Sequence, residues 1–496
     1  MQTVVGKEAL KTVHCFTPFK MSTSSDQKLR KFLLHFANDH LDFRIAELKS
    51  ILNVLNLKIE IPKHDVENPF MILHLPSVES VMNITSRAIL IRSVYELWAH
   101  GTTYSELNSE LRQLPKTFIE PHVKCQKSFK FQVTTFNRTV SNKDKIKKIE
   151  SLDENVLDFQ GKVDLKNAKH IYHIVEYYGP FCKQGTEEPL DIYFTKWVAD
   201  GQRDKINEFH LQKRHFIANT SMDAGLSMIM ANIGNVKKNM VVFDPFVGSG
   251  SLLVAAAIHG AYVLGTDIDY LLLHAKARPS RCNEKKRASD ESIRSNLRQY
   301  GLEHLYIDAL VADSSRSNMW RDKTLFDAII TDPPYGIREG AKKVGTQTAD
   351  VIIDEELKAS GNHYPKRLDY HLSDIFKDLL NFSAKYLNKN GRLVYWFPVS
   401  IQTYTEDNIP THPCLKMVHN CEQKLNTRLS RRLITMEKVK DYSEEDIHEA
   451  EVRVDHFEES TFREMYFNDS NIQKEKSSSI CDKLTVKTNS LNVNDT

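Results

Sequence analysis

The sequence lacks the features that mark secreted proteins, membrane-spanning proteins and proteins with a structural metal site. It has seven cysteines in 496 residues. None of them forms a Cys-x-x-Cys pair, so we expect free thiols in a reducing compartment and no structural metal site. No run of about 18 apolar residues is present, which argues against a membrane-spanning helix. The N-terminus has neither the apolar core of a secretory signal nor the arginines of a strong transit peptide, so the expected location is cytoplasmic.

The chain also lacks an excess of charge of one sign. Its 67 Lys and Arg residues nearly balance its 65 Asp and Glu residues, which leaves a net charge of +2. Any surface that binds nucleic acid must therefore be local. Hydrophobic residues make up 41% and charged residues 27%, as is usual in globular proteins. A chain of 496 residues is too long for one compact core, so several domains are expected.

Both ends are polar, and an α+β pattern follows the first of them. Residues 1–27 are expected to be a flexible leader, and residues 441–496 are too polar to bury a core and are expected to be a disordered tail. Residues 28–100 alternate between strand-like and helix-like periodicity, which predicts a small α+β domain. The expected elements are strands at 32–36, 71–75 and 88–94 and helices at 41–55 and 78–85.

Residues 101–215 are less regular but contain a strongly basic stretch. Phe129–Val133 alternates as a half-buried strand does, and aromatic residues are interleaved with the surrounding cations. The stretch could be a solvated surface, but the interleaved aromatics favour a surface that follows nucleic-acid phosphates. The candidate RNA-binding residues are Lys124, Lys127, Lys130, Arg138, Lys145, Lys147 and Lys148.

Residues 216–440 change to a pattern of strands alternating with helices. Such alternation predicts a doubly wound α/β domain with a mostly parallel sheet. In sheets of this kind, ligands bind beyond the carboxyl ends of the strands. The expected strands cover 239–243, 261–264, 309–312, 326–330 and 392–397, and the expected helices cover 251–259 and 372–387.

Two candidate cofactor-binding motifs follow the first strands of this domain. After the first strand comes a glycine loop that begins at Asp244, and its Gly248 and Gly250 permit positive φ and close backbone approach to a ligand. About twenty residues later, Asp267 ends the second strand, where a carboxylate can accept hydrogen bonds from ribose hydroxyls. Asp313 closes the third strand and could reach an adenine amino group. Each motif alone has a structural alternative, namely a glycine turn or a helix cap.

The third motif, Asp332-Pro333-Pro334-Tyr335, follows the apolar strand at 326–330. Two prolines fix φ and remove backbone donors, so the turn is stiff. It can hold the Asp332 carboxylate and the Pro333 carbonyl as acceptors for the two hydrogens of an exocyclic amine. Tyr335 can stack on the base that carries this amine. Acceptors placed in this way favour a tetrahedral nitrogen whose lone pair faces a methyl donor, and the motif therefore predicts methylation of an amino group.

Longer strings make a family resemblance specific. The Asp-Pro-Pro-Tyr motif resembles that of amino-group methyltransferases acting on adenine, guanine or glutamine nitrogens. Four strings, at 219–223, 296–302, 332–339 and 430–436, resemble the THUMP-containing family of catalytic subunits of eukaryotic tRNA (guanine-10-N2)-methyltransferase. The resemblance extends from about Leu29 to Val439.

The resemblance implies a Rossmann-like S-adenosylmethionine-dependent methyltransferase domain at 216–440. Before it, the resemblance implies a ferredoxin-like α+β domain at 28–100 and a THUMP-type RNA-binding region at 101–215. The substrate implied is the exocyclic N2 of guanine 10 in tRNA. By residue, it implies that Asp244, Gly248 and Gly250 contact the methionine part of S-adenosylmethionine, Asp267 the ribose and Asp313 the adenine, and that Asp332, Pro333 and Tyr335 hold the target base.

The family also implies a protein partner. Its members work with a small zinc-binding activator that adds a strand to its methyltransferase partners. In this fold the third strand lies at a sheet edge, and here Asp308–Ala312 is short, apolar and free of lysine and proline. Such an edge invites strand addition. The alternative is that a loop or the C-terminal tail covers this edge.

Two other functions stay open on the residues alone. One is methylation of adenine N6 in DNA or of a protein glutamine. The long N-terminal half, which has the features of an RNA-binding protein, argues against it. The other is a non-catalytic RNA-binding scaffold, and the intact motif at 332–335 argues against that.

Overall fold

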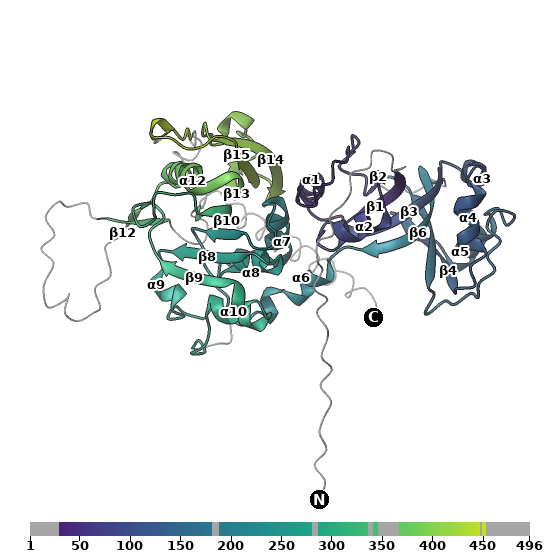
Figure 1. Cartoon of the computed structure of the whole chain (residues 1–496), viewed down its shortest axis with the longest axis horizontal. Helices are drawn as coiled ribbons and strands as arrows, with labels where there is room; N and C mark the ends of the chain where they lie inside the picture. Colours follow the sequence, from purple (N-terminus) through teal and green to yellow (C-terminus); the bar gives the residue numbers. More distant parts are fainter. Residues whose placement is uncertain are drawn as a thin grey trace, which may run out of the picture.

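The computed structural model describes residues 29–180, 188–279, 286–335, 341–345, 367–446 and 449–452. The predicted leader at 1–27 and most of the predicted tail lie outside these residues. The described chain forms two bodies, each built on its own sheet (Figure 1). Within these ranges, no helix has the length and apolar character needed to cross a membrane.

The N-terminal body contains a six-stranded sheet in the order β2-β1-β3-β6-β5-β4. β4 and β5 run parallel, and the other neighbours are antiparallel. α1 and α2 pack on the half nearer the second body, and α3, α4 and α5 lie at the far end (Figure 1). The elements are β1 (Arg30–Phe36), α1 (Arg44–Val54), β2 (Phe70–Leu75), α2 (Val78–Thr85), β3 (Ile91–Gly101), α3 (Tyr104–Arg112), α4 (Lys116–Val123), β4 (Phe129–Phe136), α5 (Asn142–Glu150), β5 (His170–Tyr177) and β6 (Asp191–Asp200).

The strand predicted at 88–94 begins three residues later than expected. Ile89 and Leu90 are buried, but their backbone N–H groups donate to the Glu47 carboxylate at 3.0 and 2.8 Å instead of to a neighbouring strand. β3 therefore starts at Ile91. It then pairs with β1 on one side and β6 on the other, so the sheet runs without a break past residue 100.

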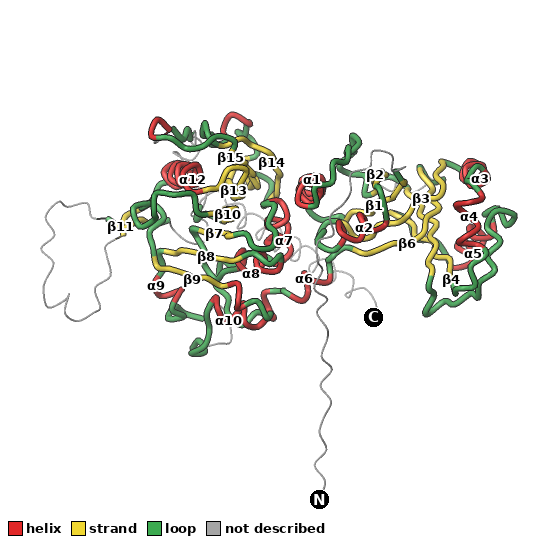
Figure 2. The backbone as a smooth tube through the Cα atoms, viewed as in Figure 1, coloured by secondary structure: helices red, strands yellow, loops and turns green. Residues whose placement is uncertain are grey.

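The second body contains a seven-stranded sheet in the order β14-β15-β13-β10-β7-β8-β9. β9, β8, β7, β10 and β13 are parallel, whereas β15 and β14 add antiparallel pairs. Figure 2 shows this sheet between layers of helices. The elements are α6 (Asp204–Glu208), α7 (Ala224–Ile233), β7 (Val241–Asp244), α8 (Ser251–Ile258), β8 (Tyr262–Asp267), α9 (Tyr270–Leu273), α10 (Ile293–Gln299), β9 (Tyr306–Val311), β10 (Phe326–Thr331), β11 (Lys342–Val344), β12 (Arg367–Asp369), α12 (Leu372–Tyr386), β13 (Leu387–Ser400), β14 (Leu415–Lys424) and β15 (Leu429–Lys438).

Both faces of this sheet are covered. Successive side chains of a strand point to opposite faces, and in β10 Ile329 packs in the cluster of α12 while Ala328 and Ile330 pack in the cluster of α7 and α8. All three side chains are fully buried. This explains why the strand appears in the sequence as a continuous apolar run. The doubly wound α/β architecture predicted from the sequence is confirmed.

The two bodies share a buried polar interface where α1 packs against α7. The Asn232 amide donates to Glu47 Oε1 at 2.7 Å and to the Arg87 carbonyl at 2.9 Å. Its own oxygen accepts from Arg87 Nε at 2.9 Å. Burial raises the pKa of Glu47, while the hydrogen bonds from Leu90, Ile89 and Asn232 lower it. One asparagine therefore satisfies polar groups from two segments of the other body.

We expect Asn232→Ala to lower the free energy of unfolding by about 2–3 kcal/mol, because Arg87 Nε and the Arg87 carbonyl lose their Asn232 partners and buried Glu47 loses one of its donors. Chemical denaturation followed by circular dichroism measures this. Asn53→Ala, at an exposed position of α1, is the matched control and should change stability by less than about 0.5 kcal/mol. Equal effects of both variants would show that the interface does not depend on Asn232.

Candidate functional site

A cavity of about 610 Å³ lies at the carboxyl ends of β7, β8 and β10. Because β8 and β9 lie on one side of β7 while β10 and β13 lie on the other, this is the point at which the strand order reverses. Ligands of doubly wound folds bind at such a point. Most of the predicted catalytic and cofactor-binding residues line the cavity, namely Asp244, Gly248, Asp267, Asp332, Pro333 and Tyr335.

The glycine loop between β7 and α8 has the backbone that its sequence predicts. Gly248 has φ +51° and Gly250 has φ +77°, a region that favours glycine. A Cβ atom on Gly250 would lie 2.6 Å from Ile293 Cγ2, so close packing also requires glycine there. A Cβ on Gly248 would meet nothing within 4 Å. The loop thus presents bare backbone to open space at Gly248.

Asp244 joins the ends of β7 and β10. Its Oδ1 accepts a hydrogen bond from the Thr331 hydroxyl at 2.6 Å and another from the Phe246 N–H at 3.0 Å. The side chain is 2% exposed. Burial raises the pKa of Asp244 to about 7, and the Thr331 and Phe246 hydrogen bonds oppose this rise.

Asp267, at the end of β8, is held by two backbone donors. Its Oδ2 accepts from the Gly248 N–H at 2.9 Å, and its Oδ1 accepts from the Asp269 N–H at 2.8 Å. Each oxygen keeps a second lone pair. Burial raises the pKa of Asp267, and these hydrogen bonds lower it. The carboxylate is thus fixed in place and retains acceptor capacity toward the cavity.

Asp313 lies apart from the other predicted residues. It follows β9 and lines a separate, much smaller cavity between the sheet and α12. Its Oδ1 accepts from the N–H and the hydroxyl of Ser315 at 2.9 and 2.7 Å, and its Oδ2 accepts from the Val344 N–H at 2.6 Å. Ser314, Pro245 and Phe246 line both cavities, so the two spaces adjoin.

The turn Asp332–Tyr335 forms the wall of the large cavity beyond β10. Asp332 Oδ1 is buried and has no hydrogen-bond partner among the described residues. Burial raises the pKa of Asp332 to about 6, while the Arg431 charge and the Tyr335 hydroxyl lower it. A buried acceptor without a hydrogen bond is costly unless a ligand donates to it. Asp332 Oδ1 is therefore the atom of this turn that is suited to accept a hydrogen bond from a ligand.

Other residues of the cavity wall were not assigned a role from the sequence. Arg431 of β15 lies 3.6 Å from Asp332 Oδ2, and the Ser221 hydroxyl lies 2.5 Å from the Ser249 hydroxyl of the glycine loop. Arg367 and Lys342 also line the cavity. Both Ser221 and Arg431 belong to strings that carried the family resemblance, which was the available signal. Their contacts join segments far apart in the chain, and spacing alone cannot reveal them.

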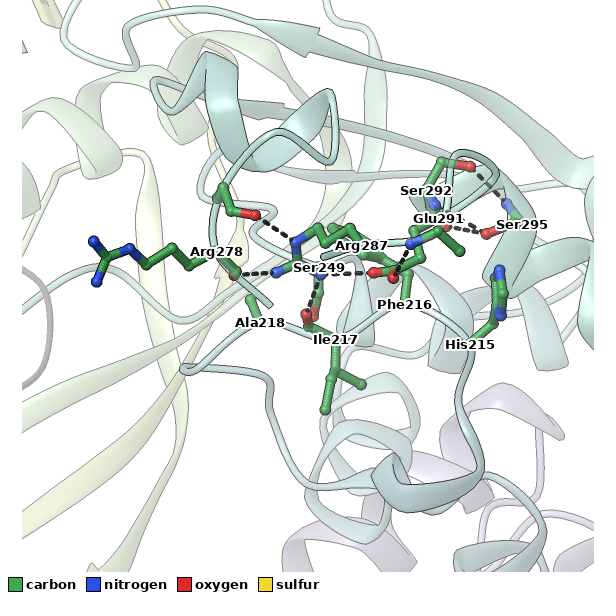
Figure 3. Close-up of polar contacts among 12 residues, drawn as sticks. His215, Phe216, Ile217, Ala218, Ser249, Arg278, Arg287, Glu291, Ser292 and Ser295 are labelled. Atoms are coloured by element: carbon green, nitrogen blue, oxygen red, sulfur yellow. Dashed lines mark hydrogen bonds and ion pairs between the residues drawn. The ribbon is translucent and has the colours of Figure 1, made fainter. Parts of the chain in front are cut away.

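The wall segment around Ser221 is anchored by buried polar side chains. Asn296 of α10 accepts from the Phe216 N–H and donates to the Phe216 carbonyl, both at 2.7 Å. Arg287 pairs with Glu291 at 2.6 Å and donates to the Ile217 carbonyl at 3.2 Å (Figure 3). These contacts fix residues 216 and 217 against α10 and the residues just before it, and so hold the segment leading to Ser221.

The predicted basic stretch lies away from this cavity, on α4, β4 and α5 at the far end of the N-terminal body (Figure 1). Its cations differ in their surroundings. Lys148 Nζ lies 2.6 Å from the fully buried Glu176 carboxylate, and the Arg138 guanidinium lies 5.0 Å from the Tyr178 ring centre. Lys127 and Lys147 are exposed. The stretch is therefore partly a structural network and partly a solvent-facing cationic surface.

Comparison with known proteins separates the functions that the residues left open. Residues 30–203 match the family described as Tmrp11 THUMP N-terminal domain, and residues 212–355 match the RMKL-like methyltransferase domain. The chain is 48% identical over 458 residues to the Bos taurus tRNA (guanine(10)-N(2))-methyltransferase TRMT11, covering 91% of this chain and 98% of the relative. The relative of the same name from Dictyostelium discoideum is 34% identical over 436 residues, covering 84% and 83%.

Among solved structures, TrmN from Thermus thermophilus matches 82% of this chain and 100% of its own, with 15% identity and a TM-score of 0.39. The predicted THUMP and methyltransferase parts, and the predicted enzyme class, are confirmed by the family matches and the curated relatives. The chain belongs to the tRNA (guanine(10)-N(2))-methyltransferase family.

Proposed function

We propose that this chain moves a methyl group from S-adenosylmethionine to the exocyclic N2 of guanine 10 in tRNA. The observation that carries this proposal is Asp332 Oδ1, a buried acceptor to which no group of the described residues donates. It lies on the wall of a cavity that also contains the glycine loop and Asp267. Relatives that match most of this chain carry the corresponding enzyme name.

The residues around the glycine loop fit this cofactor. Bare backbone at Gly248 faces open space, and Asp267 beside it keeps acceptor capacity for ribose hydroxyls. Asp244 and Gly250 complete the loop that would hold the methionine part, and Asp313 would face the adenine side from the adjoining cavity. When bound, the cofactor supplies an electrophilic methyl group.

The chain's own residues would act on the base. Asp332 Oδ1 and the Pro333 carbonyl would accept the two hydrogens of the guanine amine, and Tyr335 would stack on the ring. Accepting both hydrogens turns the nitrogen lone pair toward the methyl donor. The ionised carboxylate also stabilises the positive charge that develops on nitrogen as the new bond forms. In this role Asp332 does not have to remove a proton from the amine before the methyl group is transferred.

We expect Asp332→Ala to lower kcat by about a hundredfold or more while cofactor affinity stays nearly unchanged, because one preorganised electrostatic group is lost. Asp267→Ala should instead weaken S-adenosylmethionine binding and leave tRNA binding intact. Calorimetry with S-adenosylmethionine, electrophoretic tRNA binding and methyl transfer to bulk tRNA measure the three quantities. Turnover of Asp332→Ala within about threefold of wild type would remove the proposed role.

The methyl-transfer rate of the wild type should also depend on pH. The acceptor role needs the Asp332 carboxylate in its ionised form, and its pKa is raised to about 6. kcat/KM should therefore be full above this pKa and fall as the pH drops through about 6. A profile of kcat/KM from pH 5 to 9 measures this. If kcat/KM did not fall below about pH 6, the role of the carboxylate as acceptor would be contradicted.

The basic stretch of the N-terminal body is proposed to follow tRNA phosphates. Lys127→Ala/Lys147→Ala should weaken binding of different tRNA species to a similar extent, because phosphate contacts carry no sequence information. Each lost contact should lower the slope of log affinity against log salt by about one. Lys148→Ala is the comparison variant, since its bond to buried Glu176 predicts lost stability with an unaltered slope. An unchanged slope in the double variant would make the stretch a solvated surface.

We propose a cytoplasmic location, and a small zinc-binding activator as partner at the edge strand β9. This strand lies at the end of the sheet, as predicted, and no further strand pairs with it in the described part of the chain. Ile307 and Val311 on it are 50% and 45% exposed. A strand added here would satisfy the free backbone groups and cover these apolar side chains.

We expect the chain to be poorly soluble or inactive alone and to be rescued by co-expression with the activator. Ile307→Lys/Val311→Lys should prevent co-purification, because two charges would replace exposed apolar contacts. The matched control is Met417→Lys/Val418→Lys on β14, the opposite edge of the same sheet, where the side chains are 40% and 37% exposed. A soluble and fully active chain purified alone would show that the partner is not required.

A further inference from the structure

Arg431 of β15 lines the same cavity as the Asp332–Tyr335 turn, which is proposed to hold the target base. Its Nη1 donates to the Tyr335 hydroxyl at 2.9 Å and lies 3.6 Å from Asp332 Oδ2. The side chain is 11% exposed, so its charge is poorly screened by water. One guanidinium thus contacts both side chains of the motif that are proposed to hold the amine and the base.

The plane of this guanidinium is fixed by the strands beside it. Its Nε donates to Gln423 Oε1 of β14 at 2.7 Å. Its central carbon lies 3.9 Å from the ring centre of Trp396, a fully buried residue of β13. A planar guanidinium can stack on the indole and donate to Gln423 and Tyr335 at the same time, whereas a lysine ammonium cannot. Arg431 is therefore a preorganised group, although it lies about a hundred residues from the motif.

We propose that Arg431 is a positioning residue for methyl transfer, which directs Asp332 Oδ1 toward the target amine and sets the orientation of the Tyr335 ring. This inference rests on the proposed function. The division of contacts supports it, because Arg431 faces Oδ2 and Oδ1 is left buried and without a partner among the described residues.

Electrostatics give Arg431 a second effect on the same group. Burial raises the pKa of Asp332 to about 6, and the Arg431 charge is the largest influence that lowers it. Without Arg431 the pKa would rise further, and the protonated acid would lose acceptor capacity near neutral pH. The other groups around this pair are Tyr335 of the same turn, Asp244 at the end of β7, Asp223 before α7 and His40 of the N-terminal body.

The neighbouring residue offers a matched control. Arg432 follows on the same strand, lies 4.2 Å from the Tyr404 ring centre and pairs with Glu422 at 3.9 Å. It is thus a second half-buried arginine stacked on an aromatic ring, and it does not line the cavity. Removing it tests what the loss of a stacked arginine on β15 does to the fold.

The experiment compares Arg431→Gln, Arg431→Lys and Arg432→Gln by pH profiles of kcat/KM for methylation of bulk tRNA. An opposite charge at this range shifts a carboxyl pKa by roughly one to three units. The acid limb should therefore move up by about one to three pH units in Arg431→Gln. Activity at pH 7 should then fall by about twofold for a one-unit shift and about a hundredfold for a three-unit shift, and it should partly recover at pH 9. The pKa of the acid limb in Arg431→Lys should lie between those of wild type and Arg431→Gln. Arg432→Gln should keep the acid limb of wild type.

A second measurement does not need turnover. The pKa of Asp332 can be followed by carboxyl carbon NMR in wild type and Arg431→Gln, with the signal assigned through Asp332→Asn. A higher pKa in Arg431→Gln supports the inference even if tRNA methylation fails, so the two proposals are separable. An unmoved pKa, or an activity loss of equal size at every pH, would make Arg431 a structural residue. Weakened cofactor or tRNA binding with an unmoved limb would make it a ligand-binding residue, and would also overturn the inference.

Discussion

The hydrogen bond between the Asp244 carboxylate and the Thr331 hydroxyl, 2.6 Å long, joins the ends of β7 and β10. These two parallel strands flank the point where the order of the sheet reverses. The glycine loop begins directly after Asp244, and the proposed acceptor Asp332 directly follows Thr331. Together with the backbone pairing of β7 and β10, this contact holds the cofactor side and the base side of the cavity at a fixed separation. Asp267, at the end of β8, then fixes the loop by accepting a hydrogen bond from the Gly248 N–H.

The N-terminal body contributes to the packing behind this site. Phe43, which precedes α1, lies with its ring centre 5.9 Å from that of Trp396, and Arg431 stacks on the same indole. Arg392 of β13 donates to the Ser50 hydroxyl at 3.1 Å and to the Ile233 carbonyl at 2.8 Å. The body proposed to hold tRNA is thus packed against the strands that carry Arg431. A rigid relation between the two bodies would present the target guanine at a constant distance from the basic surface.

The sequence predicted the parts of this arrangement that depend on local pattern. The helix expected at 78–85 is α2, the strand expected at 326–330 is β10, and the motifs lie at the strand ends where they were placed. The hairpin of β14 and β15 was not predicted, because its first strand contains a register shift between Met417 and His419 that breaks the alternation. Arg431 and Asn232 act through contacts with residues remote in the chain. Only the folded structure could show that one faces Asp332 and the other satisfies Glu47 and Arg87.

Two carboxylates lie on either side of Thr331, and their surroundings differ. Asp244 has a hydroxyl and one amide as partners, and burial raises its pKa to about 7. Asp332 has a guanidinium within 3.6 Å, and its pKa is raised only to about 6. The charge of Asp332 is one of the causes that raise the pKa of Asp244, so Asp244 is the first of the two to protonate as the pH falls. In the proposed reaction the negative charge would then stay on Asp332, beside the target amine, and the Arg431 charge contributes to this difference because it lowers the pKa of Asp332.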